Sequence, residues 1–511
     1  MAGVLEERGL RPRIVIAEAV LEGRLELWDY DLLFVSGMTA DLTAVRRVVS
    51  RWREAASGRV VVGGPISSNP EDALVKARGD LAVIGEGEQT LQELLDLGLD
   101  RGRMPSNEEL NRLLGVAYLY DGAVRMNGLR PVMRRDDYNL LTPSTRAVRD
   151  YPLYYAARVY VEVLRGCSNY LRAWAALPEG ACVGCGRCRS GSLEERYDCP
   201  VGVPPGCGYC SVPSLYGPPK SRSVDKICGE VRGLLSEGVR RIVLSAPDLL
   251  DYGRDLLVEP APLTDPRQPE PNYEALEELF SRLTEMDEFA EGDASIMTEN
   301  VKGSLVTERA AMLLGRYLLG TPVNIGFETG SMEHSLQLGR PSTPEENLRA
   351  VRRLKRAVLK PYVYFIHGLP GQTAETVDET VKAIDESVEA GAARIILYRF
   401  QPLPMSAFSD QPAAPPAARD KLSGRIHEAA QKANRTLKEE LLGRSLRVIV
   451  AEPYDRDHRL HVAYPMRHGP VVLVEEARGR IGEVVEVVVS GVVSDRMVKG
   501  RLIDVMFKEI P

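Results

Sequence analysis

The chain has 511 residues, a formal net charge of −7, 44% hydrophobic residues and 27% charged residues, which is the composition of a globular protein long enough for several domains. No apolar run approaches the roughly 20 residues needed to cross a bilayer, and the first residues lack the basic-then-apolar order of a signal peptide. Eight cysteines clustered in such a chain exclude a secreted disulfide framework and favour metal or redox chemistry. We therefore expect a cytoplasmic protein without a membrane partner.

Residues 1–110 alternate short apolar segments with helix-like segments. The candidate strands are 13–17, 31–36, 59–62 and 81–84, each followed by turn residues or a helical pattern. This alternation predicts βαβ units and an α/β fold with a doubly wound parallel sheet of the Rossmann type. The glycine-rich turns at 63–65 and 85–88 would lie at the carboxyl ends of strands, where such sheets bind ligands.

The rest of the chain divides into four parts. A connecting region, residues 111–158, contains a short hairpin near 116–122. In residues 159–415 strands and helices alternate again, with candidate strands at 159–164, 241–245, 294–297, 323–328, 362–366 and 394–398. Residues 416–442 predict a charged linking helix that ends at Gly443. Residues 443–511 predict a small antiparallel β-barrel, with strands at 446–450, 470–474, 483–489 and 499–502.

Seven of the eight cysteines lie between residues 159 and 223. They are Cys167 at the end of a candidate strand, then Cys182, Cys185, Cys188 and Cys199, and finally Cys207 and Cys210. Thiolates separated by two residues bring several sulfurs within reach of one small inorganic core. The eighth, Cys228, falls in a helical pattern and is interpreted as a small buried apolar residue.

Arg165-Gly166-Cys167 and Cys207-Gly208-Tyr209-Cys210 resemble the two ends of the motif Cys-x-x-x-Cys-x-aromatic-Cys of radical S-adenosylmethionine (SAM) enzymes. The motif would be split by an insert, residues 168–206. The resemblance implies that Cys167, Cys207 and Cys210 ligate a [4Fe–4S] cluster that binds SAM and cleaves it to a 5′-deoxyadenosyl radical. In the alternative, Cys182, Cys185 and Cys188 hold that cluster, although Arg187 and not an aromatic residue precedes Cys188.

Within the insert, Cys182, Cys185, Cys188 and Cys199-Pro200 resemble the cysteine run of bacterial ferredoxins. We interpret these four cysteines as ligands of a second, auxiliary [4Fe–4S] cluster. The alternative is a structural zinc site, because four thiolates suit Zn²⁺ equally well.

Further segments resemble radical SAM enzymes in chain order, the methylthiotransferases in particular. They are Ser245-Ala246-Pro247-Asp248, residues 326–331 with Gly339-Arg340-Pro341, and residues 367–373. The resemblance implies a partial (β/α)6 barrel with its active residues at the carboxyl ends of the strands. It also implies cofactor contacts from Ser245, Glu328, Arg340, Gly368, Pro370 and Gly371, and it makes Asp248 and Glu328 candidate catalytic residues.

Both ends of the chain resemble domains that accompany such barrels. Residues 31–38, 62–65 and 85–88 resemble a cobalamin-binding domain, so cobalamin is a candidate cofactor. No histidine precedes His334, so either a corrinoid binds without a protein imidazole or the domain has lost this ligand. Gly443-Arg444, residues 482–485 and Gly500 resemble a TRAM domain, an RNA-binding barrel. This resemblance implies RNA contacts from Arg444, His458, His461, Arg467 and His468.

These features predict a radical SAM enzyme that modifies RNA, with tRNA as the expected substrate and methylthiolation of a nucleoside as the expected reaction. The expected partners are the RNA and an electron donor of the ferredoxin or flavodoxin type, and the oligomeric state stays open. One alternative is a cobalamin-dependent radical SAM methyltransferase. Another, from a different class, is a non-catalytic RNA-binding iron–sulfur protein.

Overall fold

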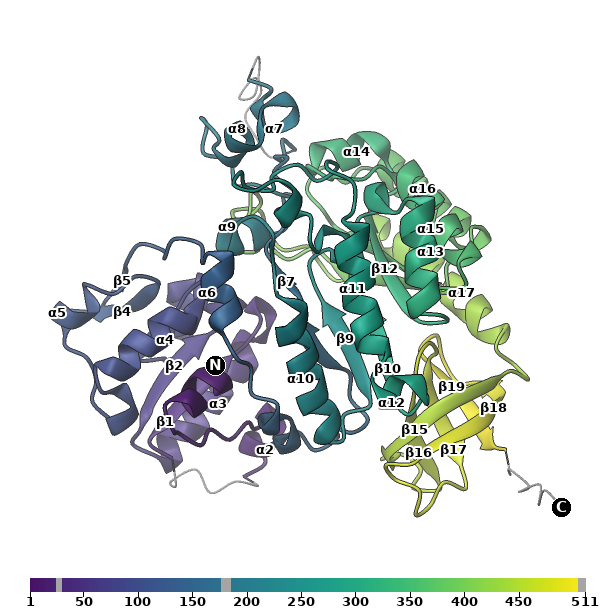
Figure 1. Cartoon of the computed structure of the whole chain (residues 1–511), viewed down its shortest axis with the longest axis horizontal. Helices are drawn as coiled ribbons and strands as arrows, with labels where there is room; N and C mark the ends of the chain where they lie inside the picture. Colours follow the sequence, from purple (N-terminus) through teal and green to yellow (C-terminus); the bar gives the residue numbers. More distant parts are fainter. Residues whose placement is uncertain (24–29, 176–184, 504–511) are drawn as a thin grey trace. The chain divides into compact units, whose positions relative to one another are not determined.

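The computed structural model describes residues 1–23, 30–175 and 185–503. They form two compact units (Figure 1). The first unit comprises Met1–Pro152, Ser214–Gly217 and Leu403–Met405, and the second unit comprises Leu153–Pro213, Pro218–Pro402 and Ser406–Pro511. Within the described ranges, every helix is too short or too polar to cross a membrane.

The first unit contains a mixed sheet in the order β1-β2-β3-β4-β5. Its strands are β1 (Leu32–Ser36), β2 (Arg59–Gly63), β3 (Leu81–Val83), β4 (Val116–Tyr120) and β5 (Ala123–Met126). The first three strands run parallel, and β4 and β5 add an antiparallel hairpin at one edge. Three predicted strands and the predicted hairpin are therefore confirmed.

The strand predicted at 13–17 is wrong. Residues 11–16 are irregular, and helix α2 (Ala17–Leu21) begins where the strand was expected to end. The backbone N–H of Ile14 donates to the carboxylate of Asp150 at 2.8 Å and not to a neighbouring strand. The segment is apolar, as the prediction required, but the backbone of Ile14 bonds to a side chain and not to another strand.

Helices cover both faces of this sheet, which explains why its strands are apolar on both sides. Helix α3 (Leu42–Ala55) buries Val45, Val48, Val49 and Trp52, a spacing of three and four residues that gives one apolar face. Trp52 belongs to the same core cluster as Val60 and Val62. The intervening Val61 packs into a second cluster with Leu94 of α4 (Gly87–Asp96). The remaining helices of this unit are α1 (Ala2–Glu7), α5 (Asn107–Leu110) and α6 (Arg135–Leu140).

The second unit begins with a partial barrel of parallel strands, here called the central barrel. Its strands are β6 (Val159–Glu162), β9 (Arg241–Ser245), β10 (Ser295–Thr298), β11 (Asn300–Val301), β12 (Pro322–Glu328), β13 (Lys360–His367) and β14 (Arg394–Arg399). They form the parallel groups β10-β9-β6 and β11-β12-β13-β14. The backbone N–H of Asn324 donates to the carbonyl of Glu299 at 2.9 Å and joins the two groups. All strands predicted for this region are confirmed.

Helices alternate with these strands, as expected for parallel crossovers (Figure 1). They are α10 (Val224–Ser236), α11 (Tyr273–Thr284), α12 (Asp287–Ala290), α13 (Glu308–Tyr317), α14 (Met332–Gln337), α15 (Pro344–Arg356) and α16 (Ala374–Glu389). The cysteine region contributes β7 (Leu164–Arg165), α7 (Arg187–Ser190), α8 (Leu193–Tyr197), α9 (Val212–Tyr216) and β8 (Lys220–Ser221).

Side chains alternate between the two faces of the central barrel. Val161, Leu244 and Phe327 point to the buried face. On the opposite face Tyr160 and Tyr398 are each 54% exposed. Tyr398 stacks on Tyr364 with 5.6 Å between ring centroids. The barrel therefore keeps an accessible, tyrosine-rich face.

Helix α17 (Lys421–Glu439) leads to a closed antiparallel barrel with one parallel pair, here called the terminal barrel. Its strands are β15 (Ser445–Pro453), β16 (Leu460–Pro465), β17 (Val471–Glu475), β18 (Val484–Val492) and β19 (Met497–Leu502). Valines from four of these strands fill its core. The linking helix and the β-barrel are confirmed, and β16 is a strand that the sequence analysis missed.

Candidate active site and cluster ligands

Cys167, Cys207 and Cys210 are brought together by the loop after β7 and by the later Cys-x-x-Cys turn. Asn169 connects them: its backbone N–H lies 3.4 Å from the sulfur of Cys167, and its side-chain amide donates to the sulfur of Cys207 at 3.3 Å. The backbone N–H of Cys210 donates to the carbonyl of Cys207 at 2.8 Å. Phe408 lies against Gly208, where an added Cβ would approach the ring to 2.4 Å.

The surroundings of these sulfurs fit an anionic cluster. Burial raises the pKa of the Cys167 thiol to about 11 and that of the Cys210 thiol to about 12. Lys302 and Arg340 oppose this effect, because a nearby cation stabilises a thiolate. Within the described residues no group of three His, Cys, Asp or Glu side chains is arranged to hold a single metal ion. The ligand roles of the cysteines therefore stay predictions.

Arg340 links this cysteine turn to the end of β12. Its Nη1 donates to the sulfur of Cys207 at 3.3 Å and to the hydroxyl of Tyr209 at 2.8 Å, and lies 3.7 Å from the carboxylate of Glu328. Burial raises the pKa of Glu328, and Arg340 opposes the shift. Glu328 and Arg340 were each predicted as cofactor contacts, and the structure places them side by side.

The backbone at Glu328 is strained in order to present this carboxylate. Glu328 has φ +66°, in the left-handed region that non-glycine residues seldom adopt, and the pairing of β12 with β13 shifts between Gly326 and Glu328. An added Cβ at Gly326 would lie 2.4 Å from the Glu328 carboxylate. Glycine at 326 therefore makes room for Glu328.

Asp248 belongs to a buried ionic network beneath the Cys167 loop. The ammonium of Lys302 lies 2.9 Å from Asp248, 2.6 Å from Asp251 and 2.9 Å from the hydroxyl of Ser168. Asp251 also pairs with Arg254, and both side chains are fully buried. Asp248 has no exposed surface, and its carboxylate also accepts from the backbone of Leu250. Asp248 is thus enclosed by this network, and its catalytic role stays a prediction.

Ser245 meets a residue that the sequence analysis missed. Its hydroxyl donates to the carboxylate of Glu299 at 2.6 Å, at the carboxyl ends of β9 and β10. Burial raises the pKa of Glu299. Glu299 also contributes to the electrostatic environment of Tyr364 and Tyr398, so it belongs to the same accessible face. No local motif surrounds Glu299 that would have identified it.

The turn after β13 contains Gly368, Pro370 and Gly371. Gly368 and Gly371 both have positive φ, +74° and +86°, which glycine adopts without strain. The carbonyl of Pro370 lies 2.9 Å from Nε2 of His334, whose Nδ1 lies 3.2 Å from Thr329. His334 therefore ties this turn to the loop after β12. It was not among the predicted site residues.

The insert is only partly within the described residues. Cys182 lies outside them, Cys185 is exposed, and Cys188 and Cys199 both contribute to the electrostatic environment of Arg172. The buried guanidinium of Arg172 donates to the carbonyls of Tyr197 at 2.9 Å and Val203 at 3.3 Å. Arg172 thus holds the insert together and places a cation near two of its thiols. The choice between an auxiliary cluster and zinc stays open.

The residues predicted to contact RNA do not form one surface. Arg444, His458 and Arg467 are exposed. His461 is only 4% exposed, so its ring is part of the terminal barrel and is not available to RNA. His468 accepts or donates a 3.0 Å hydrogen bond with the Tyr362 hydroxyl and faces the central barrel. The RNA-binding role of the terminal barrel stays a prediction.

Comparison with known proteins identifies the class. The family model "Radical SAM superfamily" matches residues 199–384, and "B12 binding domain" matches residues 2–95. The chain is therefore a radical SAM protein with a B12-binding domain, which implies a [4Fe–4S] cluster and SAM. It belongs to the same family as "Uncharacterized protein MK0932" of Methanopyrus kandleri, which is 44% identical over 94% of this chain and 86% of that protein.

Two further similarities are more distant. "Ribosomal protein uS12 methylthiotransferase RimO" of a Thermotoga species is 26% identical over 58% of this chain and 66% of that protein. The solved structure of the radical SAM methyltransferase TsrM from Kitasatospora setae, with cobalamin and a [4Fe-4S] cluster bound, has a TM-score of 0.56. That match has 15% identity and covers 80% of this chain and 72% of that chain, so it shows a shared fold.

Proposed function

We propose that this protein is a cobalamin-dependent radical SAM methyltransferase. The observation that carries the proposal is the presence, in one chain, of a B12-binding domain and a radical SAM domain whose cysteine turn, Arg340 and Glu328 are assembled. TsrM, whose structure contains cobalamin, shares its fold with 80% of this chain. These similarities support methyl transfer, which the sequence predicted as an alternative, better than methylthiolation, which was the main prediction.

The carboxyl edge of the first sheet fits a corrinoid bound without an imidazole. Histidine is absent from residues 1–333 of the sequence. An added Cβ at Gly63, the last residue of β2, would meet no atom closer than 3.9 Å. Internal packing therefore does not require glycine there, whereas close approach of a flat ligand to the backbone would. Cobalamin bound at this edge would supply a carrier for the methyl group.

Methylthiolation is the second candidate, because the chain resembles the uS12 methylthiotransferase over more than half its length. Two sequence features weigh against it. No cysteine precedes Cys167, so the first unit has no thiolates for a sulfur-donating cluster. A second cluster held by all four insert cysteines would have no open iron. RNA, and tRNA in particular, remains the predicted substrate of either reaction.

Mass spectrometry of tRNA nucleosides and of tryptic peptides, from cells with and without the gene, tests this proposal. We expect loss of one methyl modification, restored by the wild-type gene and not by Cys210→Ala. Restoration by Cys228→Ala is the matched control, because Cys228 is buried in α10 away from the cluster motif. Loss of a methylthio group would instead establish the second candidate. Loss of methylation from a peptide would support the methyl-transfer reaction, but it would show that the substrate is a protein and not RNA.

A further inference from the structure

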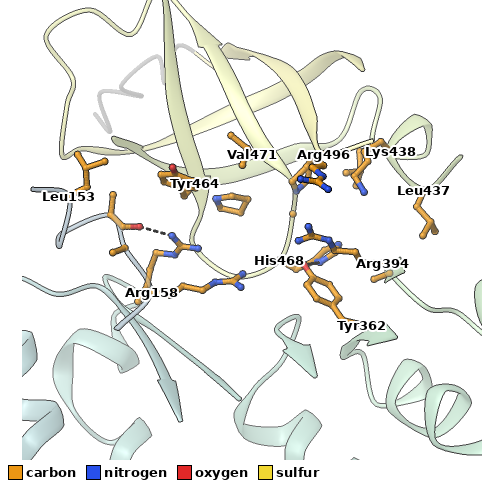
Figure 2. Close-up of a pocket in the computed structure, with 18 residues that line it drawn as sticks. Leu153, Arg158, Tyr362, Arg394, Leu437, Lys438, Tyr464, His468, Val471 and Arg496 are labelled. Atoms are coloured by element: carbon orange, nitrogen blue, oxygen red, sulfur yellow. Dashed lines mark hydrogen bonds between the residues drawn. The ribbon is translucent and has the colours of Figure 1, made fainter. Parts of the chain in front are cut away.

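A cavity of about 480 Å³ lies at the amino ends of the central-barrel strands, where the terminal barrel covers them (Figure 2). Arg158 precedes β6, Arg241 opens β9, and Arg394 opens β14. Lys438 of α17 and Arg496, just before β19, line it from the other side. The cysteine motif follows the carboxyl end of the first strand, so this cavity is at the opposite end of the barrel.

The cavity is lined by cations without carboxylates. Five side chains of its lining, Arg158, Arg241, Arg394, Lys438 and Arg496, are basic, and none is acidic. Four of them make no ion pair within the described ranges. The fifth, Arg496, has a loose contact with Asp495 at 3.8 Å and is 80% exposed. No carboxylate among the described residues lies within ion-pair distance of the inner four, although Asp495 partly offsets the charge of Lys438.

Two of these cations also have unused donors in buried positions. Arg241 is 4% exposed, and although its Nη1 donates to the carbonyl of Ala156 at 2.6 Å, its Nε has no partner. The Nε of Arg158 is likewise buried without a partner. Native proteins rarely leave buried guanidinium donors unsatisfied, because desolvation without a partner is costly.

The electrostatic cost of this arrangement appears as lowered pKa values of the basic groups around the cavity. Burial, reinforced by Arg158, lowers the pKa of Arg241 to about 9, and burial, reinforced by Arg394, lowers that of Lys438 to about 8. Burial and the surrounding cations lower the pKa of His468 to about 3, so its ring is neutral and bonds to Tyr362. A bound anion would remove this penalty.

We propose that this cavity binds an anion that carries phosphate groups. Several guanidinium forks converging with an ammonium match the charge and oxygen geometry of phosphates better than a single carboxylate. Of the five, Arg496 is 80% exposed and Arg241 is the most buried. The phosphates belong either to a small free phosphate ester or to the backbone of RNA. This site is independent of the methyl-transfer proposal, because it does not involve the cluster or the first unit.

Titration calorimetry of the full-length, cluster-loaded protein with pyrophosphate tests the site, in phosphate-free buffer of constant ionic strength. We expect saturable binding to the wild type and binding about 30-fold weaker, or weaker still, to Lys438→Met and Arg394→Gln. Lys432→Met is the matched control, since Lys432 lies exposed on the same helix. Lys438→Met removes an unpaired buried cation, so this variant should fold at least as well as the wild type.

A short RNA of mixed sequence then separates the two sources. The wild type and Lys432→Met, both loaded with pyrophosphate, are titrated with this RNA and should give the same result. Displacement assigns the site to RNA phosphates, and binding of pyrophosphate without displacement assigns it to a small phosphate ester. Absence of saturable pyrophosphate binding, or equal affinity of Lys438→Met and the wild type, would overturn the proposal.

Discussion

The guanidinium of Arg340 donates to the sulfur of Cys207 at 3.3 Å, although the two residues are 133 positions apart in the chain. The same guanidinium lies 3.7 Å from Glu328. One buried cation therefore faces both a predicted cluster ligand and a predicted cofactor contact. A change in the charge of the cysteine turn should therefore alter the electrostatic environment of Glu328 through Arg340, because charges this close interact strongly in a buried site.

The two predicted ligand sets can be separated by single substitutions. We expect Cys210→Ala to lose iron equivalent to one cluster and to abolish reductive cleavage of SAM. Cys199→Ala should lose metal from the insert while SAM still binds the first cluster. Iron, zinc and sulfide analysis with electron paramagnetic resonance measures both outcomes. Unchanged metal content in Cys199→Ala would contradict the prediction of an auxiliary metal site. Cys228→Ala is the control and should keep the metal content of the wild type.

The ammonium of Lys302 balances the charges of two buried carboxylates, so its removal should lower the free energy of unfolding. In Lys302→Met, Asp248 would lose its cationic partner and Asp251 would keep only Arg254. We expect a loss of about 3–5 kcal/mol in the free energy of unfolding, because an uncompensated charge stays buried. Urea unfolding measures it. Lys382→Met, at an exposed ion pair, should change stability by less than about 0.5 kcal/mol; equal effects would contradict this account.

Gly326→Ala tests whether glycine makes room for Glu328. The new Cβ would lie 2.4 Å from the Glu328 carboxylate and 3.1 Å from Arg340. We expect a loss of about 1–3 kcal/mol and weaker SAM binding, measured by urea unfolding and equilibrium dialysis. Gly229→Ala, in α10 with no atom within 4 Å of the added Cβ, should instead stabilise by about 0.5–1 kcal/mol. Unaltered SAM affinity in Gly326→Ala would argue against the cofactor role of Glu328.

The buried ammonium of Lys438 should make stability depend on pH. Burial, with Arg394, lowers its pKa from 10.5 to about 8, while Asp495 opposes the shift. Between these two values the unfolded chain binds more protons than the folded protein, so stability rises with pH. The penalty is complete below about pH 8, and up to about 3 kcal/mol is recovered towards pH 10.5. The wild type should therefore gain stability relative to Lys438→Met across this window in phosphate-free buffer; a constant difference would refute the shift.

Strands were predictable where β-branched residues dominate, as in Arg241–Ser245 and Arg394–Arg399. Strand β16 was missed, and its His461 was interpreted as a surface group for RNA. In the barrel, alternate residues of β16 point inward, and position 461 is one of them. Polarity alone does not reveal which side of a strand a histidine occupies, because that depends on the register with neighbouring strands.

The candidate site was predictable where a short motif carries it. The cysteine turn, Glu328 and Arg340 all lie in segments that resemble the radical SAM family. Lys302 was not predictable, because its partner Asp248 lies 54 positions away and no pattern connects them. The same holds for the cationic cavity, since Arg158 precedes one strand, Arg241 and Arg394 begin two others, and the three meet only in the folded barrel.

Transfer of a deuterated methyl group from SAM tests the central claim most directly. Cluster-loaded protein, a reductant and methyl-deuterated SAM would be incubated with tRNA and protein from cells that lack the gene, with and without cobalamin. We predict that the label enters a product only with cobalamin. Gly63→Val, at the carboxyl end of β2, should lose the transfer, while Gly491→Val, at a strand position where an added Cβ meets no atom within 4 Å, should keep it. Labelled product that forms equally well without cobalamin, or that carries sulfur with the methyl group, would contradict the account.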